Sequence, residues 1–213
     1  MINKRDISCE IKKLYSWATH DPTVYMYSWG GNGTRMIYEL IRKKYKMNGQ
    51  ADVHYKIHRW LPKNIRAFAL IGHPIDSLKS FFRKQSSDDP TFIRRHCENL
   101  GIEYFGINNF EEYAKIGQDL FLFGDFWERL MKTPRNKDLM VIKVEDLWNN
   151  LETFLAYIEM DEIIDSFPPK QNRTNELSDV LDKPEIARLH NTYHQLISDY
   201  ERLPSISMLK GKQ

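Results

Sequence analysis

The chain has 213 residues, of which 41% are hydrophobic and 13% aromatic, enough apolar material for the core of one globular domain. Lys and Arg number 31 against 29 Asp and Glu, and this net charge of +2 excludes a general nucleic-acid binder with a broad basic face. The two cysteines, Cys9 and Cys97, form neither a disulfide framework nor a metal site. We therefore predict a single domain over residues 1–213 with no bound metal.

The sequence also indicates in which cellular compartment the protein is expected. The charged N-terminal residues contain no apolar stretch of the signal-peptide type, and no apolar run approaches the ~20 residues that a membrane helix needs. The low cysteine content suits a reducing environment. We expect a cytoplasmic protein with no membrane association, and its oligomeric state cannot be read from the sequence.

After a short amphipathic segment within residues 1–20, the first informative stretch is 24–46. It begins as a run of β-branched and aromatic residues, turns through Gly30, Gly31 and Gly33, and continues with apolar residues at helical spacing. A glycine-rich turn between a strand and a helix presents backbone N–H groups and a positive helix end to an anion, most often a phosphate. No lysine follows Gly33, so the Walker A pattern of ordinary ATPases and GTPases is not met.

The remaining chain alternates strand-like and helix-like patterns. We predict further strands over 52–58, 67–71 and 139–144, and helices over 74–82, 110–133, 145–158 and 186–200. The polar stretch 86–109 is predicted to be a surface excursion or lid, and the tail 204–213 is expected to fray.

This alternation predicts an α/β domain with a parallel sheet flanked by helices. Ligands of such sheets bind beyond the carboxyl ends of the strands. The glycine turn, His58, His73 and Lys143 are each predicted to lie at such an end.

The order of these pieces resembles the sulfotransferases that use 3′-phosphoadenosine 5′-phosphosulfate (PAPS). Residues 30–34 look like the 5′-phosphosulfate loop of the family, and 55–58 look like its Lys-Thr-His segment. Residues 71–82 are similar to its 3′-phosphate segment, and 141–147 to its Tyr-Glu-Asp-Leu strand and helix. Residues 172–174, Asn-Arg-Thr, resemble the Asn-Lys/Arg-Ser/Thr that follows, so the resemblance spans about 24–175.

The resemblance implies a P-loop NTPase-like fold that moves a sulfuryl group from PAPS to a hydroxyl or amine, without a metal. Adenosine 3′,5′-bisphosphate would be the product. The acceptor would be a small molecule or a glycan, such as a carbohydrate or small alcohol. On the matched positions, His58 is the catalytic base and Ser80 a 3′-phosphate ligand. The loop ligands of the 5′-phosphosulfate are Gly30, Gly31, Asn32, Gly33 and Thr34.

Two departures from the family pattern remove expected cations. The loop cation aligns with Gly31, and the 3′-phosphate arginine aligns with Gly72. A charged hydrogen bond of this kind contributes on the order of 1.5–3 kcal/mol, so replacements are needed. From their spacing in the sequence, Arg35, Lys56 and Lys143 are candidates to replace the missing cation of the loop. Arg83 or Lys79 is the candidate beside Ser80, because positions 76, 80 and 83 share one helix face.

We therefore predict that His58 takes the proton of the acceptor and that Lys56 steadies the bridging oxygen or leaving phosphate. The rival interpretation of His58 is a histidine that is merely hydrogen-bonded. Two other functions stay open: a non-catalytic binding module of the same fold, and, less favoured, a nucleotide-dependent P-loop kinase. Arg94, Arg95 and His96 either face an anionic or sugar acceptor or form a solvated surface.

Overall fold

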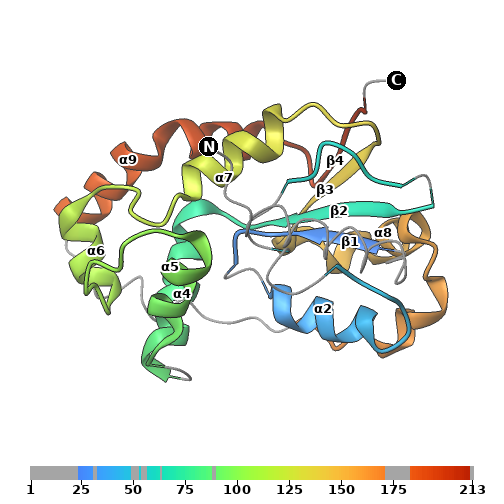
Figure 1. Ribbon diagram of the computed structural model, residues 1–213, viewed down its shortest axis with the longest axis horizontal. Helices are drawn as coiled ribbons and strands as arrows, with labels where there is room; N and C mark the ends of the chain where they lie inside the picture. The colour runs from blue at the N-terminus through green and yellow to red at the C-terminus, as the bar shows by residue number, and fades with distance from the viewer. Residues whose placement is uncertain are drawn as a thin grey trace, which may run out of the picture.

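The computed structural model describes residues 24–30, 33–48, 53, 57–62, 64–87, 90–170 and 183–211. In these ranges the larger elements are β1 (Val24–Tyr27), α2 (Thr34–Arg42), β2 (Arg66–Ile71), α4 (Pro74–Ser87), α5 (Phe92–Leu100), α6 (Phe110–Ile116), α7 (Phe123–Lys132), β3 (Leu139–Lys143), α8 (Leu151–Ile158), α9 (Lys183–Arg202) and β4 (Ile206–Leu209) (Figure 1). Short 3₁₀ segments are η1 (Val144–Asp146), η2 (Trp148–Asn150) and η3 (Asp161–Ser166).

The described strands form one four-stranded sheet in the order β1-β2-β3-β4. β1 pairs with β2 and β2 with β3 in parallel, which confirms an α/β domain with a mostly parallel sheet. The carboxyl ends of these strands, at Tyr27, Ile71 and Lys143, therefore lie at one edge. β4 pairs antiparallel with β3, so the expectation of a frayed tail was wrong for residues 206–209. Their backbone finds hydrogen-bond partners on the open edge of β3.

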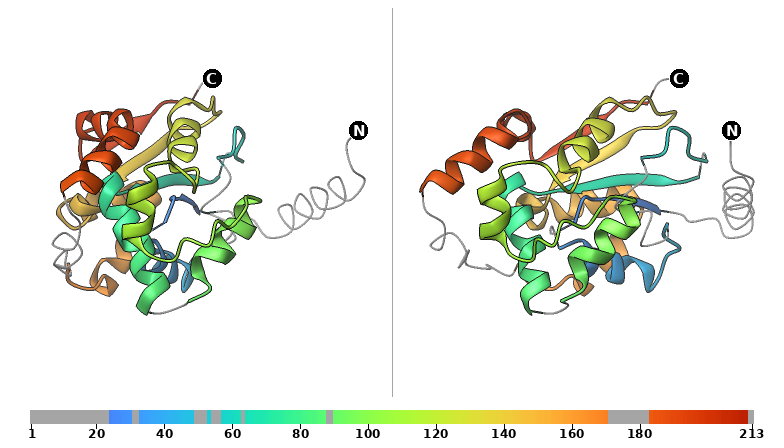
Figure 2. Two further views of the ribbon diagram at one scale, coloured as in Figure 1. Left: turned by 90° about the vertical axis from the view of Figure 1, so that its left-hand side faces the viewer. Right: turned by 60° about the vertical axis from the view of Figure 1, so that its left-hand side comes forward.

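Helices cover both faces of the sheet (Figures 1 and 2). Alternate strand residues such as Tyr25, Ala69 and Val141 pack in a core with α4, α5, α6, α7 and α9. The intervening residues, such as Met26 and Phe68, pack in a second core with α2, α8 and η3. A strand that is buried on both faces has no polar positions, which explains the continuous apolar run in β2.

The expected single helix over 110–133 is two helices, α6 and α7. Gly117 ends α6 with a left-handed backbone, φ 63°, and its N–H donates to the carbonyl of Tyr113. The Asp119 carboxylate then accepts the N–H groups of Phe123 and Gly124, at 2.9 and 2.6 Å, and begins α7. The apolar stripe correctly indicated that Tyr113, Phe123, Trp127 and Leu130 are buried, but Ile116 is exposed. The stripe carried no information on the break between the helices.

The stretch 86–109 was predicted to be a surface excursion or lid, and the structure corrects this for part of it. α4 continues to Ser87 and residues 92–100 form α5, whereas residues 101–109 are in neither a helix nor a strand. Ile93, His96 and Cys97 are buried, and the His96 ring lies 4.7 Å from the ring of Phe81. Arg94 and Arg95 are on the exposed side of α5, whereas His96 is on its buried side and is not a surface residue.

The outer edge of β1 is held by the chain that follows α2. Asn48 is buried, and its side-chain amide exchanges two 2.9 Å hydrogen bonds with the backbone N–H and carbonyl of Met26. Further along, the Ser28 N–H donates to the carbonyl of Val53 at 2.9 Å. The strand predicted over 52–58 falls mostly outside the described residues, and Ile57 and His58 lie in a loop.

We predict that Asn48→Ala lowers the free energy of unfolding by about 2–4 kcal/mol, because two buried backbone groups of Met26 lose their partners. Urea denaturation followed by circular dichroism measures this. The control is Asn149→Ala, which truncates an exposed asparagine and should change stability by less than about 0.5 kcal/mol. Equal effects of the two substitutions would contradict the role of Asn48 as a partner for β1.

Candidate functional site

The turn that joins β1 to α2 is closed by two buried hydroxyl groups. Ser28 Oγ and Thr34 Oγ1 lie 2.8 Å apart, and both residues are buried. Ser28 Oγ also accepts the N–H of Gly30 at 3.2 Å. These contacts tie Ser28, the first residue after β1, to Thr34, the first residue of α2. They also mean that the Gly30 N–H already has an acceptor, whereas the sequence had placed it among the cofactor ligands.

Two glycines of the turn have backbones that favour glycine. Gly30 has φ 119° and Gly33 has φ 68°, in the region where a Cβ is unfavourable. A Cβ on Gly33 would meet only Val144 Cγ2, at 4.0 Å, so conformation rather than space selects glycine there. Gly31 and Asn32, two further predicted ligands, lie outside the described residues.

The first turn of α2 contains backbone N–H groups that have no hydrogen-bond acceptor among the described residues. The N–H groups of Met36 and Ile37 both donate to the carbonyl of Gly33, at 3.0 and 3.3 Å. Within the described part of the chain, the N–H groups of Gly33, Thr34 and Arg35 have no acceptor. The first turn contains no acidic residue. The partial positive charge of a helix N-terminus is therefore not offset by a carboxylate of its own helix.

Arg35 adds a formal charge at this helix end. Its side chain is exposed and makes no ion pair with a described residue, whereas Arg42 at the other end of α2 pairs with Glu39 at 2.6 Å. That Arg35 replaces the cation missing at Gly31 stays a prediction, because Gly31 lies outside the described residues. The other predicted replacement, Lys56, lies outside the described residues.

The neighbouring strand end, between β2 and α4, is occupied by a carboxylate of the chain itself. Glu145 Oε1 accepts the N–H of His73 at 2.8 Å, just before α4 begins, and Oε2 accepts the hydroxyl of Tyr200 at 2.7 Å. Burial and the nearby Glu145 raise the pKa of the Tyr200 hydroxyl, so it remains a donor. The Lys143 ammonium lies 4.5 Å from the centroid of the Tyr200 ring. Glu145 thus takes the place where an anion would meet the start of α4.

Ser80 and Arg83 lie together on α4, as their spacing predicts. Arg83 Nη2 donates to Ser80 Oγ at 3.3 Å, and both side chains are half-buried. Lys79, the other candidate cation, lies 3.6 Å from a carboxylate oxygen of Asp76. The Asp76 carboxylate therefore offsets part of the charge of Lys79.

His58 lies over one face of β1. Its Nδ1 is 3.2 Å from the hydroxyl of Tyr27, the last residue of β1, and its ring meets Tyr25 edge-on at 5.0 Å. The sequence had placed His58 at the end of a strand over 52–58, most of which lies outside the described residues. The ring is held instead by tyrosines of the strand that enters the glycine turn, and it lines a small cavity together with Arg135.

Arg135 was not identified from the sequence, although it is buried and lines the same small cavity as His58. It follows an amphipathic helix and a proline, where an arginine is usually exposed. Nothing in its spacing distinguishes it from Arg94 or Arg95, both of which are exposed.

Comparisons with protein-family models, with curated proteins and with solved structures gave no match. Within the described ranges, no group of three His, Cys, Asp or Glu side chains could hold a metal ion. No described helix is both long and apolar enough to span a bilayer.

We predict that Gly33→Ala and Gly106→Ala destabilise the protein equally, by about 1–2 kcal/mol. Both glycines have positive φ, 68° and 74°, and a Cβ would find space at each position. Chemical denaturation measures the two losses. A much larger loss for Gly33→Ala would mean that the turn has a packing constraint beyond its backbone conformation. Gly106 lies outside the turn, so Gly106→Ala measures the conformational cost alone. Any loss of ligand binding that is seen only in Gly33→Ala would then come from the turn itself.

Proposed function

We propose that the chain is a sulfotransferase that uses PAPS and transfers its sulfuryl group to a hydroxyl or amine of a small molecule or glycan. The observation that carries the proposal is the closed glycine turn at the carboxyl edge of the sheet. Ser28 and Thr34 hold its two ends together, and within the described residues the N–H groups of Gly33, Thr34 and Arg35 at the start of α2 have no acceptor. Such an arrangement binds a phosphate or sulfate group.

A second group of possible anion ligands, on α4, supports the proposal that the ligand is a nucleotide with two separate phosphate groups. β1 and β2 are neighbours in the sheet, so α2 and α4 both start from the same edge. Ser80 and Arg83 on α4 are joined by a hydrogen bond and offer a hydroxyl and a guanidinium for a 3′-phosphate. The absence of a lysine after Gly33 disfavours a nucleoside triphosphate in the turn.

The proposed reaction needs positioning and charge more than covalent catalysis. The acceptor oxygen forms a bond to sulfur while the bond between sulfur and the oxygen of the 5′-phosphate breaks. The N–H groups of the turn and Arg35 stabilise the charge on the peripheral oxygens and on the leaving phosphate. His58, whose ring Tyr27 orients through Nδ1, accepts the acceptor's proton.

The main alternative is a non-catalytic binding module with the same fold. Glu145 favours it, because its carboxylate already binds the His73 N–H at the start of α4. Gly72, in the same turn, lacks the cation that the resemblance leads one to expect. The alternative therefore predicts weak or no binding of a 3′-phosphate.

Calorimetric titration with adenosine 3′,5′-bisphosphate, PAPS and ATP·Mg²⁺ separates these functions. We expect both adenosine 3′-phosphates to bind and ATP·Mg²⁺ to bind at least tenfold more weakly. Arg35→Gln should weaken bisphosphate binding by about 10–100-fold, through loss of one charged hydrogen bond. The control Arg42→Gln, at the far end of α2, should leave it unchanged. No binding of either adenosine 3′-phosphate would contradict the proposal, and preference for ATP·Mg²⁺ would favour a kinase.

His58→Ala should abolish turnover with PAPS while leaving the dissociation constant of adenosine 3′,5′-bisphosphate within about twofold, because a base contributes to proton transfer and not to nucleotide binding. Release of the bisphosphate in the presence of a panel of hydroxyl and amine acceptors measures turnover. Tyr27→Phe, which removes the hydroxyl beside Nδ1, should reduce the rate less than His58→Ala. An unchanged rate in His58→Ala would remove His58 from the mechanism.

A further inference from the structure

Trp29, the residue immediately before Gly30, is anchored by the segment that connects α6 to α7. Its side chain is buried, its indole Nε1 donates to the carbonyl of Phe121 at 3.3 Å, and its ring stacks on that of Phe123 at 4.3 Å. Phe121 belongs to residues 117–122, which we call the linker, and Phe123 is the first residue of α7. The entry to the glycine turn is therefore held by a segment that lies 92 residues further along the chain.

The linker ends in a backbone conformation that needs support. Leu122 has φ 56°, in the left-handed region that a residue with a side chain rarely adopts unless its surroundings hold it there. Asp119 supplies such a hold, because its carboxylate accepts the N–H groups of Phe123 and Gly124 directly after Leu122. The position of the Phe123 ring, on which Trp29 stacks, thus depends on Asp119.

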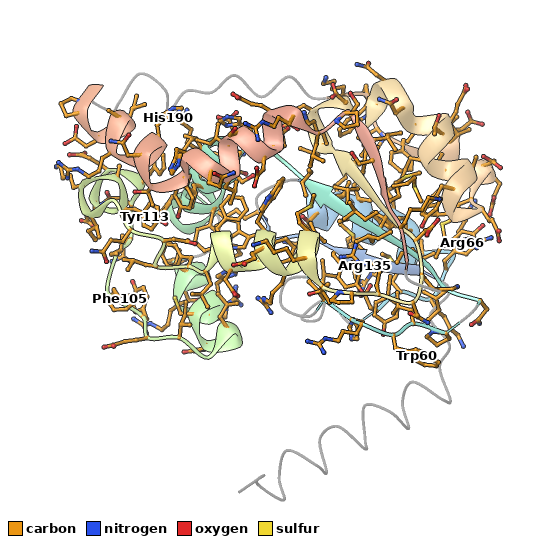
Figure 3. The ribbon with its side chains drawn as sticks, turned by 90° about the horizontal axis from the view of Figure 1, so that it is seen from above. Trp60, Arg66, Phe105, Tyr113, Arg135 and His190 are labelled. Atoms are coloured by element: carbon orange, nitrogen blue, oxygen red, sulfur yellow. The ribbon has the colours of Figure 1, made fainter. Side chains whose placement is uncertain are left out.

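Helix α9 binds the linker at two points. Thr192 Oγ1 donates to the carbonyl of Gly117 at 2.7 Å, and the Tyr193 hydroxyl donates to Asp119 Oδ1 at 2.9 Å. Because a tyrosine hydroxyl has one proton, the Tyr193 oxygen accepts the hydroxyl of Tyr113 on α6, which Figure 3 shows beside α9. Burial raises the pKa of both tyrosine hydroxyls, so both remain donors.

We propose that Trp29 is a positioning residue of the glycine turn, and that α9 sets the position of Trp29, and with it the anion affinity of the turn, through the linker. Each step from Tyr193 to Asp119, Phe123 and Trp29 is a hydrogen bond or a ring contact between described residues. Protein interiors are close-packed and transmit strain, so the loss of one contact displaces its neighbours. The effect on nucleotide affinity rests on the proposed function, whereas the coupling of α9 to the turn does not.

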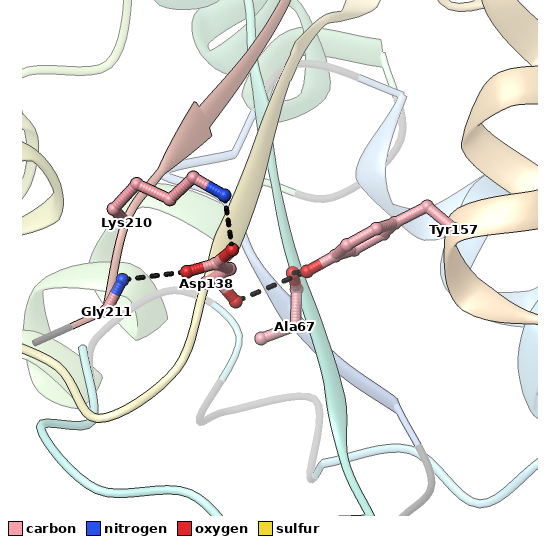
Figure 4. A network of polar contacts seen from close by, with 5 residues as sticks. All are labelled: Ala67, Asp138, Tyr157, Lys210 and Gly211. Atoms are coloured by element: carbon pink, nitrogen blue, oxygen red, sulfur yellow. Dashed lines mark hydrogen bonds and ion pairs between the residues drawn. The ribbon is translucent and has the colours of Figure 1, made fainter. Parts of the chain in front are cut away.

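The experiment compares Tyr193→Phe with Tyr157→Phe, because each substitution removes one hydroxyl and leaves the aromatic ring. The Tyr157 hydroxyl donates to the carbonyls of Ala67 and Asp138, at 3.0 and 3.2 Å (Figure 4). Tyr157 belongs to α8, which packs on the opposite face of the sheet from α9. A general loss of stability would therefore affect both variants, whereas loss of the contact with Asp119 affects Tyr193→Phe alone.

The readout is the ¹H–¹⁵N NMR spectrum of each ligand-free variant. We expect Tyr193→Phe to shift the indole N–H signal of Trp29 and the amide signals of Gly30 and Gly33, and to speed hydrogen exchange of the indole N–H at least fivefold. Tyr157→Phe should leave the signals in place and the exchange rate within twofold. If these signals in Tyr193→Phe match those of the wild type, or if Tyr157→Phe moves them equally, the proposal is overturned.

Titration with adenosine 3′,5′-bisphosphate separates this inference from the proposed function. We expect its dissociation constant to rise at least fivefold in Tyr193→Phe and to stay within twofold in Tyr157→Phe. If the wild-type protein does not bind the nucleotide, the proposed function fails, and the NMR comparison still decides the coupling. Equal affinities of the two variants would overturn the claim that α9 sets the affinity of the turn. Where Tyr193→Phe fails to fold, Thr192→Val, which removes the hydroxyl bound to Gly117, replaces it in both measurements.

Discussion

The hydrogen bond between the hydroxyls of Ser28 and Thr34 is the contact on which the glycine turn depends. It spans 2.8 Å in a buried position and joins the end of β1 to the start of α2. Gly30 and Gly33 both have positive φ in this turn, and the Gly30 N–H donates to the same Ser28 hydroxyl. The first turn of α2 contains no acidic residue that would neutralise the helix N-terminus.

The same strand links this turn to the cavity beside His58. β1 is an edge strand of the described sheet, held on its outer side by Asn48 and on its inner side by β2. Tyr27 ends the strand, and its hydroxyl reaches Nδ1 of His58, whose ring lies in the cavity with Arg135.

Local patterns in the sequence predicted the parallel strands, the glycine turn and the contact of Ser80 with Arg83, because each depends on spacing along one or two elements. Features that depend on tertiary pairing were missed. β4 was expected to fray, since its partner, the open edge of β3, is distant in the sequence. α5 was taken for a loop, because its polar residues outnumber the few that are buried. The burial of Arg135 and the carboxylate of Glu145 at the start of α4 arise from contacts between distant segments, which periodicity does not report.

The central claim is that the N–H groups at the start of α2 bind the 5′-phosphate group of an adenosine 3′,5′-bisphosphate. Backbone ¹H–¹⁵N NMR of the protein titrated with this nucleotide tests it most directly. The account predicts that the amide signals of Gly33, Thr34 and Arg35 shift and saturate together, ahead of those in α5 and α6. Saturation confined to another surface, or no saturable shift of these three amides, would contradict it.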